Sequence, residues 1–133
     1  MPWSLRRGGE DGPLRSWLPL GTVDSGVLAR VDPAGLVQLE GRNWSLDWWV
    51  RAEDRWHHPS MEAAVSQTAD GASPVLRTAM RVPGGEVTQR CAAAQVRAGT
   101  WSGAGAAVEV TNDSAVPVAL VFVLRPYRLD GRG

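Results

Sequence analysis

The sequence predicts an all-β protein, an antiparallel β-sandwich preceded by a loosely structured N-terminal arm. Short apolar runs recur along most of the chain, several of them alternate with polar residues, and clusters of Gly, Pro, Asn and Asp separate them. The length of 133 residues fits one domain with a sizeable core. We expect residues 1–24, which are rich in Gly, Pro and Arg, to form the arm, and residues 25–133 to form the sandwich.

The stretch from Gly26 to Val50 is expected to anchor the core. Two apolar runs, 27–31 and 36–40, flank Asp32-Pro33-Ala34-Gly35 and predict a β-hairpin. Asp can bond its own backbone, Pro presets φ, and Gly accepts a positive φ, so we expect φ > 0 at Gly35. A tryptophan-rich strand, 44–50, follows the hairpin, and its adjacent Trp48 and Trp49 should point to opposite faces.

The rest of the chain predicts a meander. Residues 51–59 indicate an irregular loop with one helical turn at 52–56, and Gly99 to Gly105 indicate a loop that carries Trp101. The alanine run 92–94 is compatible with either helix or strand. Strands are expected at 61–68, 74–82, 86–96, 106–111 and 118–125.

The last predicted strand is apolar on both faces. Val118, Leu120, Phe122 and Leu124 would face one way, and Ala119, Val121 and Val123 the other. Either the strand is central and covered on both sides, or its second face meets a partner. We expect a surface apolar patch in which some of Ala119, Val121 and Val123 join Trp48 or Trp49.

Two stretches resemble the N-terminal β-sandwich of bacterial glucoamylase- and trehalase-like, six-hairpin glycoside hydrolases. Leu28 to Val37 resembles the opening hairpin of that domain, and Leu124-Arg125-Pro126-Tyr127-Arg128-Leu129-Asp130-Gly131 resembles an Arg-Pro segment near the end of one of its strands. Met80 to Gly85 is compatible with its middle strands. The chain departs from the family where Leu46-Asp47-Trp48-Trp49-Val50 stands in place of a Trp-x-Cys-x-Pro motif and a Phe-Asp pair.

The resemblance implies a helical α/α-toroid catalytic domain after the sandwich, with two glutamates as acid and base. No catalytic residue can be transferred to this chain, so we expect a non-catalytic accessory domain, truncated from a larger protein. Its partner would be a helical glycosidase-like domain, or a second copy bound through an apolar sheet face. The alternative is a free-standing carbohydrate-binding or protein-interaction sandwich with a Trp-rich surface.

The candidate binding or interface residues are chosen for the interactions that their side chains can make. Trp rings stack on sugars and mark interaction surfaces. The densest polar cluster is His57-His58 next to Glu53 and Asp54. We expect Asp54 to pair with Arg51 or Arg55 and a His to bond a backbone carbonyl; no metal site or cofactor is expected, because adjacent His residues on a strand diverge. A small hydrolase using Asp54 and His57 is the third hypothesis. The candidates are Trp44, Trp48, Trp49, Asp54, Trp56 and His57.

Charge and cysteine content narrow the possible binding partners and the cellular location of the protein. Fourteen basic and fourteen acidic residues balance, which gives no electrostatic case for nucleic acid or an anionic membrane. The single Cys91 excludes an internal disulfide and is expected to be a small buried hydrophobe. No apolar run follows the basic residues near the N-terminus, so no secretory signal is predicted and we expect a cytoplasmic protein.

Overall fold

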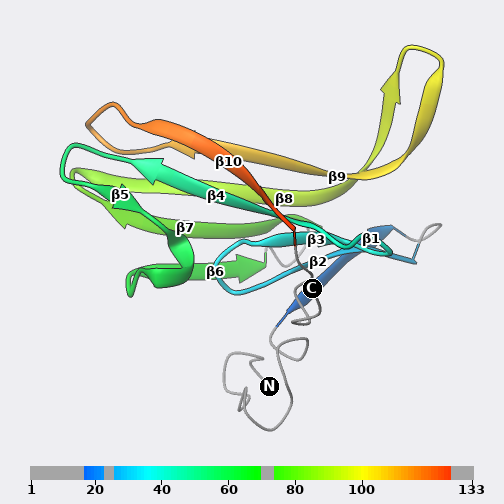
Figure 1. The fold of residues 1–133 in the computed structure, drawn as a ribbon, viewed down its shortest axis with the longest axis horizontal. Helices are drawn as coiled ribbons and strands as arrows, with labels where there is room; N and C mark the ends of the chain where they lie inside the picture. The colour runs from blue at the N-terminus through cyan, green and yellow to red at the C-terminus, as the bar shows by residue number, and fades with distance from the viewer. Residues whose placement is uncertain (1–16, 23–25, 70–73, 127–133) are drawn as a thin grey trace, which may run out of the picture.

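The chain folds as two antiparallel sheets packed face to face, as the computed structural model shows for residues 17–22, 26–69 and 74–126 (Figure 1). The predicted all-β sandwich is therefore confirmed, and no α-helix occurs in these ranges. Sheet A contains β1 (Leu18–Thr22), β2 (Gly26–Val31), β3 (Val37–Leu39), β4 (Ser45–Arg51) and β10 (Ala119–Arg125) in that spatial order, and β5 (Trp56–His57) also pairs with β4. Sheet B contains β6 (Val65–Ala69), β7 (Leu76–Val82), β8 (Gly85–Ala98) and β9 (Trp101–Asn112).

The β2–β3 hairpin forms as predicted, and its turn is partly buried, with Pro33 exposed and Gly35 buried. The Asp32 carboxylate accepts hydrogen bonds from the backbone N–H groups of Ala34 and Leu36, both at 2.9 Å. Gly35 has φ +87°, which confirms the expected left-handed conformation. Burial raises the pKa of the Asp32 carboxyl, although these backbone bonds act in the opposite direction.

Three side chains from both sheets hold this turn in place. The indole Nε1 of Trp48 donates to the Ala34 carbonyl at 2.9 Å. The side-chain amides of Gln89 and Gln67 donate to the carbonyls of Gly35 and Asp32, each at 2.8 Å. Three carbonyls of the turn thus accept side-chain hydrogen bonds, as polar groups that are removed from water require.

The core consists of two apolar clusters between the sheets. One joins the β1–β3 end to sheet B and includes Val31, Leu76 and Cys91. The other joins β4 to β7 and β8 and includes Trp48, Val50 and Met80. Packing of the two sheets removes these apolar side chains from water, which stabilises the folded chain.

Several local predictions were wrong. Leu18–Thr22 was assigned to the irregular arm but forms β1, which pairs with β2; residues 1–16, including Trp3, lie outside the described ranges. The predicted helical turn at 52–56 is absent: residues 52–55 are irregular, and the short β5 and a 3₁₀ turn at Pro59–Met61 follow them. The strand expected from Met61 begins only at Val65.

The β8–β9 hairpin is longer than predicted and extends beyond the body of the sandwich (Figure 1). Residues 101–105, assigned to a loop, belong to β9, and the alanine run 92–94 is strand. These Gly- and Ala-rich segments pair in continuous register, Ala94 opposite Gly105 and Ala98 opposite Trp101. Polar and apolar residues do not alternate clearly in these segments, so backbone pairing across the hairpin determines their strand conformation.

Candidate functional site

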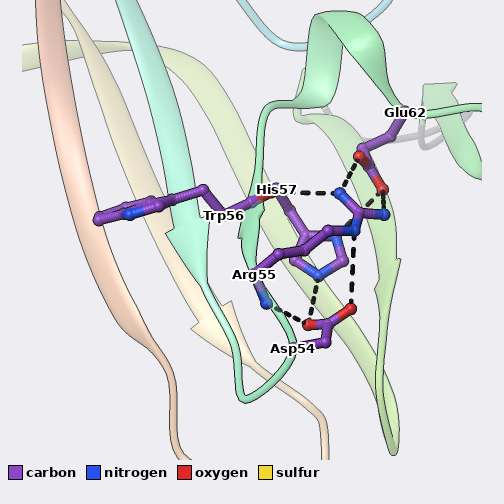
Figure 2. Close-up of polar contacts among 5 residues, drawn as sticks. All are labelled: Asp54, Arg55, Trp56, His57 and Glu62. Carbon is purple, nitrogen blue, oxygen red and sulfur yellow. Dashed lines mark hydrogen bonds and ion pairs between the residues drawn. The ribbon is translucent and has the colours of Figure 1, made fainter.

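The densest polar group lies just after β4, around β5. Figure 2 shows Asp54, Arg55, His57 and Glu62 turned toward one another, with Trp56 pointing away from them. His57 is 2% exposed because it lies directly opposite buried Val50 on the core side of sheet A. Its Nε2 lies 3.0 Å from Asp54 Oδ1 and its Nδ1 3.0 Å from Glu62 Oε1. Each ring nitrogen of His57 thus contacts one carboxylate.

Arg55 completes the cluster as a bidentate partner of Glu62. Its Nη1 lies 2.7 Å from Glu62 Oε2, its Nη2 lies 3.0 Å from Glu62 Oε1, and its Nε lies 3.7 Å from Asp54 Oδ2. The bond from Arg55 lowers the pKa of Glu62, and the bond from His57 lowers the pKa of Asp54. The expected pairing of Asp54 with Arg55 is present, whereas the expected bond of a His to a backbone carbonyl is replaced at His57 by two carboxylate contacts.

The polar groups of this cluster form their hydrogen bonds and ion pairs with one another. Both nitrogens of the only histidine in it are engaged, and the Arg55 guanidinium faces the same two carboxylates. Within the described ranges, no group of three or more His, Cys, Asp or Glu side chains is arranged to hold a metal ion. The geometry thus makes Asp54, Arg55, His57 and Glu62 a clasp that joins the β5 loop to the end of the 3₁₀ turn.

The four candidate tryptophans divide between two faces of sheet A. Trp48 is fully buried in the core, and Trp44 lines a small apolar cleft of about 110 Å³ between β3, β4 and β9. Trp49 lies on the outer face, where its ring meets His58 edge-on at 4.8 Å. Trp56 is opposite Arg51 in the β4–β5 pair and therefore shares this outer face, with 37% of its surface exposed. Trp48 and Trp49 thus point to opposite faces, as predicted.

An ion pair on this outer face, between buried Asp47 and partly exposed Arg125, was not anticipated from the sequence. Asp47, 3% exposed, accepts bonds from Arg125 Nε and Nη2 at 3.0 Å and from Trp49 Nε1 at 3.1 Å. The guanidinium carbon of Arg125 lies 5.7 Å from the centroid of the Trp49 ring. Asp47 and Arg125 are 78 positions apart in the chain, so only the pairing of β4 with β10 brings them together.

β10 carries the clearest exposed apolar surface. Its residues Leu120, Phe122 and Leu124 lie opposite Val50, Trp48 and Leu46, so they belong to the core face of sheet A. Yet they are 38%, 45% and 66% exposed, because β10 is at the edge of the sheet and the facing sheet leaves them uncovered. We call these three side chains the open side. On the outer face Val121 is also exposed and lies directly opposite Trp49, so the expected apolar patch is present.

Two further features concern the cysteine thiol and the length of the helices. Cys91 is buried in the core, and burial raises the pKa of its thiol to about 12, which makes it a poor nucleophile. In the ranges that the structure describes, no helix has the length and apolar content needed to cross a membrane.

Comparison with known proteins adds no relative: no protein-family model, no curated protein and no solved structure matches this chain.

Proposed function

We propose that this chain is a non-catalytic accessory β-sandwich that packs against a helical glycosidase-like domain through its open side. The observation that carries the proposal is the exposure of Leu120, Phe122 and Leu124 on the core face of sheet A. Contiguous exposed apolar side chains of this size mark interaction surfaces in proteins that are otherwise polar outside. They are already partly buried, so burying them fully would stabilise a complex by at most roughly 1.5–3 kcal/mol for each side chain.

The nature of the partner rests on the resemblance to six-hairpin glycoside hydrolases. The Leu28–Val37 segment that carries this resemblance does form a hairpin, β2–β3, which supports the proposal without identifying the partner. The self-satisfied clasp around His57 supports a non-catalytic role for this chain. A cytoplasmic location is part of the same proposal and rests on the single cysteine.

Binding to a helical catalytic domain of a bacterial glucoamylase, stripped of its own sandwich, tests this proposal by calorimetry. The wild-type chain should bind, and Leu124→Ser should weaken binding because it removes the most exposed apolar side chain of the open side. Met61→Ser is the matched control: Met61 is 80% exposed but lies in the 3₁₀ turn, away from β10. No binding by the wild-type chain, or equal weakening by both variants, would contradict the proposal.

The same proposal predicts no glycosidase activity for the chain alone. Purified protein should leave maltose, trehalose and aryl glucosides intact. Turnover that is abolished by Asp54→Asn would instead assign a catalytic role to the clasp and overturn the non-catalytic assignment.

A free-standing carbohydrate-binding module is the second candidate, favoured by the shared outer face of Trp49 and Trp56. Sugar rings stack on exposed indoles, and Trp56 offers the more exposed one. Titration with soluble α-glucans, followed by tryptophan fluorescence, separates the two candidates. Loss of glucan binding in Trp56→Ala, with normal binding in Leu124→Ser, would favour the carbohydrate module.

A further inference from the structure

In the part of the chain that the structure describes, the terminal strands of the two sheets, β1, β6, β9 and β10, differ in how they are protected against pairing with another strand. Exposed edges in monomeric proteins usually carry charges, prolines, bulges or short strands, which prevent edge-to-edge association. β1 contains Pro19 and an irregularity between Leu20 and Gly21, and β6 has only five residues. β9 carries Glu109 on its exposed side.

β10 has none of these devices between Ala119 and Leu124. This run has no charge, proline or glycine, and its register with β4 is regular over seven residue pairs. Among the strands that the structure describes, β10 pairs only with β4, so its other backbone edge is open to a further strand. Pro117 and Pro126 flank the strand and limit the segment that can pair.

The sequence of this edge is a palindrome, Leu-Val-Phe-Val-Leu from 120 to 124. When two copies of such a strand pair antiparallel about a twofold axis at its centre, Phe122 lies opposite Phe122, and each Val and Leu lies opposite its own residue type. Residues directly opposite share a face of the sheet, so the side chains of the open side would meet their own counterparts. A twofold interface requires this kind of self-complementarity.

We propose that β10 binds β10 of a second copy of this chain, antiparallel and centred on Phe122, and joins the two A sheets into one continuous sheet. The pairing satisfies the open backbone edge and brings the apolar side chains of both copies together. One seven-residue edge is smaller than a standard protein interface, so the dimer should be weak and reversible. This inference is independent of the proposed function, because it concerns the chain without any second domain.

Substituting Phe122 with Lys or Glu tests whether residue 122 pairs with its own counterpart in the second copy. Like charges directly opposite each other destabilise strand pairing, whereas opposite charges support it. Sedimentation velocity at rising concentration should show dimer for the wild type and at least about tenfold weaker association for Phe122→Lys and for Phe122→Glu. An equal mixture of the two variants should dimerise again, because only a pairing that sets residue 122 against itself places Lys beside Glu. Phe122 is 45% exposed, and circular dichroism of each variant checks that the fold is kept.

A cysteine cross-link provides the second measurement. Phe122→Cys should form a disulfide-linked dimer under mild oxidation, since opposed strand residues lie about 4.5–5.5 Å apart at Cα, which disulfides can span. Cys91, the chain's own cysteine, is buried and should not interfere. Met61→Cys, at an exposed site away from β10, is the control. Three results would overturn the proposal. The wild-type chain could stay monomeric, the Phe122→Lys and Phe122→Glu variants could dimerise as strongly as wild type, or cysteines at positions 61 and 122 could cross-link equally.

Discussion

β4 and β10 are neighbouring strands of similar apolar content, but most of β4 is buried and most of β10 is exposed. They pair along seven residues, with Trp48 directly opposite Phe122. Trp48 is fully buried, whereas Phe122 is 45% exposed. The difference lies in position: β4 has partners on both sides and sheet B beneath it, while β10 is at an edge that sheet B does not cover. Burial therefore depends on where a strand stands in the sheet order, and apolar sequence alone does not determine it.

The largest expected effect comes from Trp48. Trp48→Ala should lower the free energy of unfolding by about 3–5 kcal/mol, because it leaves a large cavity and removes the indole bond to the Ala34 carbonyl. Phe122→Ala, on the opposite side of the same residue pair, should cost about 1 kcal/mol or less in dilute solution. Urea unfolding of both variants measures the contrast; equal losses would show that β10 is as well packed as β4.

Gly35 provides the next test, because this residue of the hairpin turn packs closely against Gln89 and Trp48. A Cβ at Gly35 would lie 2.7 Å from Gln89 Oε1 and from Trp48 Nε1, in addition to the strain of φ +87°. Gly35→Val should therefore cost about 2 kcal/mol or more. The control is Gly41→Val, where φ is +78° but no atom lies within 4 Å of the added Cβ, so only the backbone strain of about 1–2 kcal/mol is expected. Equal unfolding midpoints for the two variants would refute the close-approach argument.

The smallest effect is expected at the clasp, on the exposed margin of the core. The pKa values of Asp54 and Glu62 are lowered in the folded chain, so the unfolded chain binds more protons on acidification. Their contribution to stability is present above the ordinary carboxyl pKa, near 4, and is lost as pH falls through the lowered values. Glu62→Gln should flatten this acid loss of stability, measured by thermal unfolding across pH, whereas exposed Glu53→Gln should leave it unchanged. Parallel pH profiles for wild type and Glu62→Gln would contradict this role.

Local turn chemistry made part of the fold predictable. The Asp32–Gly35 turn and its positive φ follow from residue types that act within four positions of one another. The opposite orientation of Trp48 and Trp49 follows from strand geometry alone. The fold class followed because these signals recur along the chain.

Features that depend on distant pairing were not predictable. The start of β9 at Trp101 depends on the partner strand β8, because the Gly- and Ala-rich sequence there has no strand signal of its own. Glu62 was missed as a partner of His57 because the intervening 3₁₀ turn, which has no periodic pattern, brings the two together. The sequence showed that 118–124 is apolar on both sides, but the edge position of β10 appears only in the sheet order.

Hydrogen exchange of the β10 amides, measured against those of β4 at rising protein concentration, tests the central claim most directly. If the β10 edge is an interaction strand, half of its amides should exchange fast in dilute solution, because in a paired edge strand alternate N–H groups point away from the neighbour. Those amides should gain protection as the chain associates, while β4 stays equally protected throughout. β10 amides as protected as those of β4 at the lowest concentration, or unchanged at the highest, would contradict the account.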